Sequence, residues 1–277
     1  MRAASDADID AITALRESVG WSAHEWALRA ALQPPNARCL VVTAGEGRII
    51  GIGSGISYGA LGFVGNMIVG EEHRGRGVGS AVLEAVIDFL DGRGCRRLEL
   101  FATPAGRPLY ARHGFELTDP SAMVAVPRDA VPAAPAEVHI GEATDLDALR
   151  DYDAPRFGGD RGSLLAMMHA DRQRPLLVAR SRDGIGGYLW LRPDGSRVGP
   201  FLADDPAIAA ALLGAAFERI ALAEEITLNV PMSNQLGVHW LRDLGLSLEP
   251  WDGRMGRGPQ IERRNDTIYA NLVGALG

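Results

Sequence analysis

The two halves of this 277-residue chain carry the same order of apolar segments, and this internal repeat constrains the fold more than any other feature. Residues 127–137 read PRDAVPAAPAE, and a proline- and alanine-rich stretch without periodicity predicts a linker. On each side of it, hydrophobic periodicity predicts the element order β-α-α-β-β-β-α-β-α-β. The sequence therefore predicts two tandem domains, at residues 1–126 and 138–277.

The third predicted strand shows the repeat most clearly, with VGNMIVGEE at residues 64–72 and VGPFLADDP at residues 198–206. A long apolar helix follows in both halves. The connection into that helix differs, because the first half inserts HRGRGVG whereas the second passes directly from Asp205 to Pro206. Proline suits the first position of a helix, where its missing N–H costs nothing. The halves are therefore predicted to differ at this connection although they share an element order.

The composition argues against several classes of protein. Hydrophobic residues make up 47% of the chain, enough for one or two cores, and the net charge of −7 without a basic stripe argues against a nucleic-acid binder. An acidic surface favours amine partners or simply keeps a protein in solution. Two cysteines without a C-x-x-C pair argue against a zinc site or a disulfide framework, and no signal segment or membrane-spanning run is recognisable. We therefore expect a cytoplasmic protein that needs no metal and no membrane.

The loop at residues 74–79, RGRGVG, lies between a buried strand and an amphipathic helix and has the properties of an anion-binding site. Its alternating glycines let the backbone adopt unusual φ angles and approach a ligand closely. Its N–H groups precede the first turn of a helix, where donors are unpaired and the helix dipole favours negative charge. Arg74 and Arg76 would add charge-assisted hydrogen bonds. The loop is therefore predicted to hold a phosphate or pyrophosphate.

The glycine spacing narrows the class of ligand. No Gly-Lys-Ser/Thr follows, so this is not a Walker loop, and Ser80 stands where the dinucleotide-binding fingerprint needs its third glycine. The pattern Arg-x-x-Gly-x-Gly, after a strand and opening a helix, instead resembles the acetyl-CoA motif of the GNAT superfamily of N-acetyltransferases. A tight turn with surface arginines is the alternative interpretation.

A second segment, LELFATPAGRPLYARHGF at residues 98–115, resembles the same superfamily. Tyr110 stands four residues before Gly114, the spacing of the family tyrosine whose hydroxyl lies near the thioester sulfur. The resemblance implies that Tyr110 donates a proton to the departing CoA thiolate, a leaving group that a nearby acid assists. The alternative is that Tyr110 only packs its helix on the sheet. His113 beside it is more typical of a partner for the helix dipole.

The resemblance also implies how acetyl-CoA is held. Its pantetheine arm would pair with the backbone of the strand before the loop, and an N–H there would polarise the thioester carbonyl. The pyrophosphate would lie on the loop. The predicted cofactor-binding residues are Met67, Ile68, Val69, Arg74, Gly75, Arg76, Gly77, Val78, Gly79 and Ser80.

The general base stays open at this stage. The side chains with suitable chemistry are His24, Glu25, Glu71 and Glu72, and a chain of water molecules would serve equally well. The role of several residues outside the two motifs is open too. Asp153, Asp160 and Arg161 either shape the acceptor site or form a salt-bridged helix start. The aromatic residues that either line a pocket or belong to a core are Trp21, Trp26, Tyr188 and Trp190.

The second half has Leu241 at the position of Tyr110 and lacks the loop, so we interpret it as a degenerate GNAT-like domain without its own acetyl-CoA. The whole chain resembles bacterial two-domain GNAT proteins. That resemblance implies an α/β (α+β) fold of two tandem GNAT-like domains, each a mixed, mostly antiparallel sheet flanked by helices.

The same resemblance implies an acetyl-CoA-dependent N-acetyltransferase. The acetyl group would move to a primary amine of a small molecule, an amino acid or a peptide, by direct attack in a ternary complex. A non-catalytic acyl-CoA-binding or regulatory module is the alternative function. The oligomeric state stays open.

Overall fold

The computed structural model describes residues 1–21, 25–33, 35–171, 174–182, 184–192, 197–219, 224–272 and 274–277. The chain forms two compact units. Unit 1 comprises Met1–Thr118, Arg254–Ile261 and Gly274–Gly277. Unit 2 comprises Asp119–Gly253 and Glu262–Val273.

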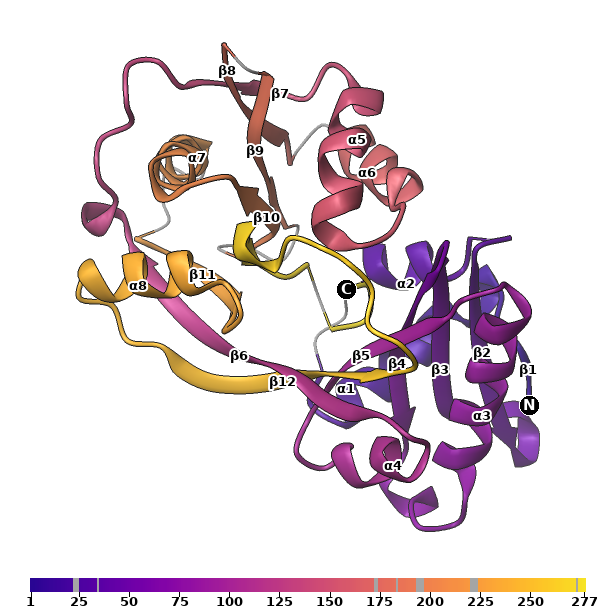
Figure 1. The fold of residues 1–277 in the computed structure, drawn as a ribbon. Helices are drawn as coiled ribbons and strands as arrows, with labels where there is room; N and C mark the ends of the chain where they lie inside the picture. Colours follow the sequence, from indigo (N-terminus) through magenta and orange to yellow (C-terminus); the bar gives the residue numbers. More distant parts are fainter. Residues whose placement is uncertain are drawn as a thin grey trace. The chain divides into compact units, whose positions relative to one another are not determined.

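Unit 1 is built on strands hydrogen-bonded in the order β1-β2-β3-β4-β5, with β12 beside β5 (Figure 1). Neighbouring strands from β1 to β4 are antiparallel, whereas β4 and β5 are parallel. The strands are β1 (Arg2–Ala3), β2 (Ala37–Ala44), β3 (Arg48–Tyr58), β4 (Leu61–Val69), β5 (Arg97–Ala102) and the end of β12 (Glu249–Arg257). The helices are α1 (Ile9–Ser18), α2 (Glu25–Ala31), α3 (Val78–Gly92) and α4 (Arg107–Arg112), with 3-10 turns η1 (Asp6–Asp8), η2 (Gly45–Gly47) and η3 (Glu71–His73).

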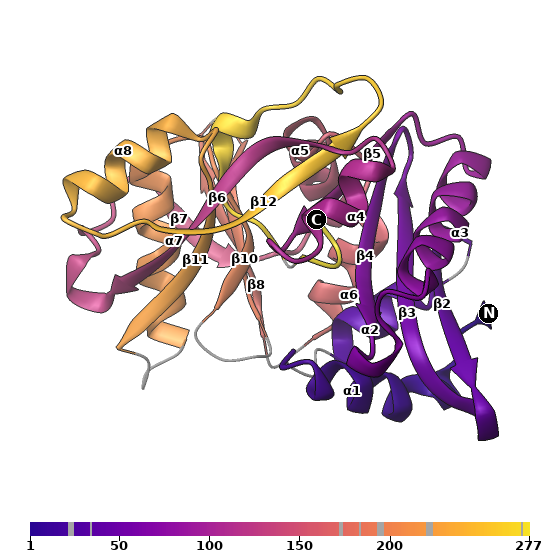
Figure 2. The same ribbon diagram turned by 90° about the horizontal axis from the view of Figure 1, so that it is seen from below.

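Helices cover both faces of this sheet, with α3 on one face and α1 and α2 on the other (Figures 1 and 2). The alternation of side chains along β2 explains the division, because Leu40 packs with α3 while Cys39 and Val41 pack with α1. In α3 the buried residues are Val82, Leu83, Val86, Ile87 and Leu90, which is the apolar face that the sequence predicts.

A stripe of glycines on β3 sets how closely α3 approaches the sheet. Gly51, Gly53 and Gly55 alternate along the strand and therefore share one face. A Cβ at Gly53 would lie 2.5 Å from Cγ1 of Val82, so only a bare backbone accepts the helix at this distance. This close packing fixes the position of the N-terminus of α3, where the predicted loop joins the helix.

Unit 2 repeats this architecture with strands in the order β13-β10-β9-β8-β7, all antiparallel, and with α7 packed against β8 and β9. A further antiparallel pair joins β6 to β11. The strands are β6 (Glu116–Pro127), β7 (His139–Glu142), β8 (Leu176–Ser181), β9 (Gly184–Leu191), β10 (Val198–Ala203), β11 (Glu225–Pro231) and β13 (Ile268–Ala270). The helices are α5 (Leu146–Phe157), α6 (Gly162–Ala170), α7 (Pro206–Arg219) and α8 (Gln235–Asp243), with 3-10 turns η4 (Arg128–Ala130) and η5 (Asn265–Thr267). The predicted fold class, two mostly antiparallel sheets flanked by helices, is confirmed, although the sheet of unit 2 is wholly antiparallel and not mixed.

The boundaries of the units differ from the predicted domains 1–126 and 138–277. Unit 2 already begins at Asp119, because β6 pairs with β11 from Ser121 to Pro127. The predicted linker 127–137 lies within unit 2, where the Arg128 N–H donates to the Glu224 carbonyl at 2.9 Å. The content of proline and alanine predicted a linker. In the structure, Pro127 pairs with Glu225 and Val131 packs against the unit 2 core, so this stretch is part of unit 2.

The C-terminal part of the chain also departs from the predicted division, because two of its segments belong to unit 1. Arg97 donates to the Gly258 carbonyl at 2.9 Å, and the Tyr58 hydroxyl donates to the Leu276 carbonyl at 2.8 Å. Such long-range contacts have no local signal in the sequence. Among the described residues, no helix is both long and apolar enough to cross a membrane.

Both cysteines lie in the core of unit 1, and we expect neither to react in the native protein. Burial raises the pKa of the Cys39 thiol to about 12 and also raises the pKa of Cys95. Because the thiolate is the reactive form, a disulfide thiol reagent at pH 8 should find no rapidly reacting thiol in the native protein and both cysteines after denaturation. Stoichiometric labelling of the native protein within minutes would contradict this burial.

Candidate active site

The site begins where β4 and β5 separate. The two strands pair from Leu61 opposite Arg97 to Phe63 opposite Glu99, and within the described residues their register ends there. Further along, β4 shifts its register against β3, and Asn66 in the shifted stretch has a φ of 52°. A bulge bends its strand and increases the local twist, so β4 turns away from β5. The edge of residues 67–69 that faces β5 is left open.

The backbone of this edge points into the gap. The Gly70 N–H donates to the Ile50 carbonyl at 2.9 Å, so these two residues form a hydrogen-bonded pair of the antiparallel ladder. Such pairs alternate, and therefore Val69, opposite Gly51, turns its N–H and carbonyl away from β3. The carbonyl accepts the Nε–H of Arg74 at 3.0 Å. The Val69 N–H is thus placed to bond a ligand that lies along the strand.

The predicted loop joins this edge to α3. Gly75 and Gly77 have φ values of 72° and 81°, a left-handed backbone that glycine adopts without strain. Gly77 is the N-cap of α3, and the first helical hydrogen bond runs from the Ala81 N–H to its carbonyl at 3.0 Å. In the described part of the chain, no side chain caps the N–H groups of the first turn. These donors and the positive end of the helix dipole are available for an anion.

Cations surround the start of α3. Arg74 is exposed and pairs with Glu71 at 3.4 Å between Nη1 and Oε1. Arg76 is exposed as well and has no ion-pair partner among the residues that the structure describes. Arg112 of α4 contributes a third guanidinium, and it lines the cavity together with Arg74. The surroundings of the loop are therefore positively charged, although the chain as a whole has a net charge of −7.

Tyr110 lies in α4 on the opposite wall. The helix begins at its N-cap Gly106, whose N–H donates to the Thr103 hydroxyl oxygen at 3.3 Å. The Tyr110 side chain is 7% exposed, and its ring packs edge-on against Phe115 with 6.2 Å between the centroids. Phe115 of the predicted motif therefore helps to fix the orientation of the tyrosine ring.

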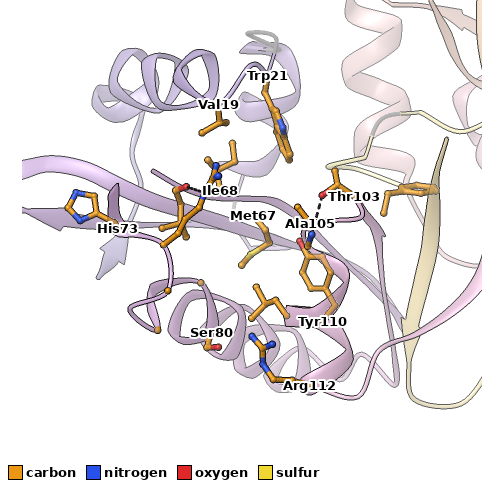
Figure 3. A pocket seen from close by; sticks show the side chains of 18 residues that line it. Val19, Trp21, Met67, Ile68, His73, Ser80, Thr103, Ala105, Tyr110 and Arg112 are labelled. Atoms are coloured by element: carbon orange, nitrogen blue, oxygen red, sulfur yellow. Dashed lines mark hydrogen bonds between the residues drawn. The ribbon is translucent and has the colours of Figure 1, made fainter. Parts of the chain in front are cut away.

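Loop, strand edge and tyrosine line one cavity of about 580 Å³ (Figure 3). The predicted site residues on its wall are Met67, Ile68, Val69, Arg74, Gly75, Gly77, Gly79, Ser80 and Tyr110. Arg76 and Val78 belong to the loop but are not part of the wall. In Figure 3, Met67 and Tyr110 lie between Ser80 and Arg112 at one end of the cavity and Val19 and Trp21 at the other.

The rest of the wall was not predicted from the sequence. It consists of Val19, His73, Phe101, Thr103, Ala105, Gly106, Leu109 and Arg112. Trp21 lines the cavity, which resolves one of the open aromatic assignments. The other three are not on the wall, since Trp26 lies on α2 and Tyr188 and Trp190 are core residues of unit 2. Of these residues, only Phe101 could have been expected from the sequence, because it lies in the strand directly before the helix that contains Tyr110.

A buried polar network holds the bulge of β4 in place. Asn66 is 2% exposed, and its Oδ1 accepts Nη1 of Arg16 at 2.6 Å while its Nδ2 donates to Ser54 Oγ at 3.0 Å. Burial lowers the pKa of the Arg16 guanidinium. The carbonyl of Arg16 accepts the N–H groups of Val19 and Trp21, at 3.2 and 2.9 Å. Arg16 therefore ties the open strand edge to the far wall of the cavity.

Replacement of Asn66 tests this network. Asn66→Ala keeps a Cβ in left-handed backbone, a strain of about 1–2 kcal/mol, and removes the two side-chain hydrogen bonds that offset it, worth about 1 kcal/mol each. Asn66→Gly removes the same bonds without the strain. We expect the alanine variant to lose more free energy of unfolding than the glycine variant in chemical denaturation. Equal stability of the two variants would contradict the left-handed geometry at this position.

The candidate general bases lie away from the cavity wall. Glu25, Glu71 and Glu72 each form an ion pair with an arginine, at 2.6, 3.4 and 2.7 Å, and none of them lines the cavity. His24 lies outside the described residues. His113 contacts a backbone carbonyl and a glutamate and is not on the wall either. The geometry therefore favours proton loss to solvent over any of these described side chains.

Asp153, Asp160 and Arg161 of unit 2 all take part in ion pairs. Asp153 and Arg161 are 1% and 3% exposed and form a two-point ion pair at 2.8 and 2.9 Å, to which the Tyr188 hydroxyl donates. Asp160 pairs with Arg150 at the surface. Buried groups that satisfy one another are not accessible to a substrate. The observation supports a salt-bridged helix start over an acceptor site.

The position in unit 2 that corresponds to the loop is closed to an anion. At the start of α7, Asp205 accepts the Ile208 N–H at 2.9 Å, so a carboxylate already caps the helix. The edge of β10 is not open, because β13 pairs with it. Leu241, in place of the tyrosine, is completely buried. In unit 2, a carboxylate therefore occupies the helix start and strand β13 occupies the strand edge that are both open in unit 1.

Comparison with known proteins agrees with this division. A sequence model of the acetyltransferase (GNAT) family matches residues 8–115, and a model of an acetyltransferase (GNAT) domain matches residues 149–270. Together the two matches cover most of the chain. No curated protein sequence matches it.

Solved structures share the fold over the whole chain. A protein of Pyrococcus horikoshii, described only provisionally as an acetyltransferase, has a TM-score of 0.82 at 22% identity, over 100% of this chain and 95% of that one. A GCN5-related N-acetyltransferase from Sphaerobacter thermophilus has a TM-score of 0.66 at 19% identity (95% and 97% covered). A tandem GNAT protein from the clavulanic acid biosynthesis pathway has a TM-score of 0.66 at 16% identity (94% and 98% covered). The present chain belongs to the GNAT acetyltransferase superfamily and carries two GNAT domains in tandem.

Proposed function

We propose that this protein is an acetyl-CoA-dependent N-acetyltransferase that acts on a primary amine of a small molecule, an amino acid or a peptide. The observation that carries the proposal is the single cavity in which an uncapped helix start, an open strand edge and Tyr110 meet. The pyrophosphate would accept hydrogen bonds from the N–H groups of Gly79 and Ser80, with Arg74 and Arg76 adding positive charge. The pantetheine arm would lie along residues 67–69. Acyl transfer from a thioester needs no metal, so acetyl-CoA is the only cosubstrate in this proposal.

In the proposed reaction the amine nitrogen attacks the thioester carbonyl carbon directly, while both substrates are bound. The Val69 N–H donates to the carbonyl oxygen as negative charge develops on it. The carbon–sulfur bond then breaks, and Tyr110 gives its hydroxyl proton to the thiolate. The proton that the amine nitrogen loses restores Tyr110 through solvent, so the products are the amide and the free CoA thiol.

A non-catalytic acyl-CoA-binding module is the alternative, and Tyr110 is the observation that disfavours it. A pure binding module does not need an acid on the wall beside Met67. Release of free thiol from acetyl-CoA in the presence of an amine separates the two functions.

The proposal also places the enzyme in the cytoplasm, which the two buried, unpaired cysteines support. A nucleic-acid partner is not part of the proposal, because the net charge of the chain is −7.

Titration calorimetry with CoA tests the first step of the proposal. The wild-type protein should bind CoA with a micromolar Kd. Arg76→Glu should weaken binding by about 100-fold, because a charge-assisted contact is replaced by repulsion of the pyrophosphate, whereas the neutral Arg76→Gln should lose about 10-fold. A wild-type protein that gives no binding heat and no thermal stabilisation with CoA would contradict the proposed site.

A further inference from the structure

The two ends of the cavity differ in chemistry, and the difference bears on the acceptor amine. One end holds the loop, Ser80 and Arg112, whereas Val19 and Trp21 lie at the other (Figure 3). Phe101 also lines the cavity, and because its neighbours Leu100 and Ala102 pack with α3, its side chain lies on the opposite face of the sheet, the face that α1 covers. This inference rests on the proposed function, in which the pyrophosphate lies at the loop end and the thioester lies near Tyr110. The acceptor must then approach from the side of the cavity where Trp21 and Phe101 lie.

That side is apolar and aromatic. Trp21 is one of the few large hydrophobic side chains with an exposed surface, at 37%, and Phe101 and Met67, which also line the cavity, are half-buried. Aromatic side chains supply a large, rigid contact area for an apolar ligand. An exposed indole on a cavity wall gains most when a ligand of similar shape covers it.

A buried guanidinium lies over each of the two rings. Cζ of Arg16 is 5.6 Å from the ring centroid of Trp21, and Cζ of Arg254 is 5.4 Å from that of Phe101. The two arginines are 5% and 2% exposed, so solvent screens their charges poorly. Each ring therefore already interacts with a cation, and a second cation on its other face would be repelled.

One buried carboxylate lies among the arginines behind Phe101. Glu99 is 1% exposed and is shared by two guanidinium groups, Arg97 at 3.1 Å and Arg254 at 3.7 Å. These three groups together carry one net positive charge. Among the described residues that line the cavity, none carries a carboxylate. A substrate with several positive charges would find no partner on this wall.

We propose that the acceptor is a primary amine on an apolar, aromatic-sized body that carries no further positive charge. The body covers Trp21 and Phe101, and the single amine points toward the thioester. The positive field of the wall helps the bound ammonium to lose its proton, which yields the neutral nucleophile without a dedicated carboxylate base. Polyamines and other polycations are excluded as good substrates, in spite of the acidic net charge of the chain.

Three probe amines test the proposal with thiol release from acetyl-CoA as the readout. 2-Phenylethylamine offers the aromatic body, ethylamine lacks it, and spermidine adds further charges. The wild-type enzyme should use 2-phenylethylamine with a kcat/KM at least 10-fold above that of either other amine. Preferred turnover of spermidine would overturn the inference and leave the acetyl transfer itself standing. Failure of all three amines, with CoA binding intact, would contradict the inference together with the proposed amine transfer.

Variants of Trp21 assign the preference to this wall. Trp21→Ala should lower kcat/KM for 2-phenylethylamine by about 10-fold, leave that for ethylamine nearly unchanged, and keep the Kd for CoA. Trp21→Glu should raise the ratio of spermidine to 2-phenylethylamine. Trp251→Ala, at a tryptophan that is 57% exposed and outside the cavity, is the matched control and should change nothing. Equal losses for all amines in Trp21→Ala would overturn the assignment.

Discussion

Ser80→Asp is expected to abolish CoA binding while the protein stays folded. Ser80 lies in the first turn of α3, where the uncapped N–H groups face the cavity. A carboxylate there would accept these donors itself and would also repel the pyrophosphate. Two like charges about 4 Å apart repel by about 4 kcal/mol at an effective dielectric constant of about 20, which corresponds to about 1,000-fold in Kd. Calorimetric titration with CoA measures the loss.

The stability of this variant separates a local effect from unfolding. An acidic residue in the first turn of a helix adds about 0.3–1 kcal/mol, so the Tm of Ser80→Asp should equal or exceed that of the wild type. Unit 2 offers a related case, because Asp205, directly before α7, accepts an N–H of the first turn of that helix. Ser80→Asn, of similar size but uncharged, is the control and should retain most of the affinity. A Ser80→Asp protein that binds CoA as the wild type does would show that the pyrophosphate lies elsewhere.

Tyr110→Phe is expected to lower kcat by about 100-fold, within the ~10²–10⁴ range that a positioned acid contributes. The ring, its packing against Phe115 and the cavity shape are preserved, so the Kd for CoA should not change. A loss of kcat with an unchanged Kd is the signature of an interaction made only in the transition state. Steady-state thiol release together with calorimetry provides both quantities.

The control for this variant is a second buried tyrosine of unit 1. Tyr58 donates to the Leu276 carbonyl and does not line the cavity. Tyr58→Phe should cost about 1 kcal/mol of stability and leave kcat unchanged. If Tyr110→Phe turns over as fast as Tyr58→Phe, then Tyr110 has only a packing role.

Local signals predicted the half of the site that we propose binds an anion. Alternating glycines before an amphipathic helix dictate a left-handed loop and free N–H donors, and the structure has both at Gly75 and Gly77. The interval from Tyr110 to Gly114-Phe115 similarly predicted a helix that contains the tyrosine, and the structure has Tyr110 in α4. These features depend on residues a few positions apart, and for that reason a sequence pattern contains them. Their roles in binding and proton transfer remain predictions until the variants above are measured.

Long-range contacts decided the rest. The bulge at Asn66 depends on Arg16 and Ser54, which lie 50 and 12 positions away in the chain. The wall at Trp21 and Phe101 likewise combines segments that no local motif connects. An asparagine with left-handed backbone inside a strand cannot be predicted from strand propensity, because contacts with residues distant in the sequence offset its strain.

The sequence by itself determined the internal repeat, the fold class, the glycine loop before α3 and the absence of that loop from the second half, because each depends on local periodicity or spacing. Only the tertiary structure decided where the units begin and end, since the strand ending at Arg257 and the segment Gly274–Gly277 return to unit 1 through contacts across most of the chain. It also decided that β13 closes in unit 2 the kind of edge that stays open in unit 1. Strand pairing joins residues that are distant in sequence, and the burial gained by each pairing decides which strand edge is filled and which is left for a ligand.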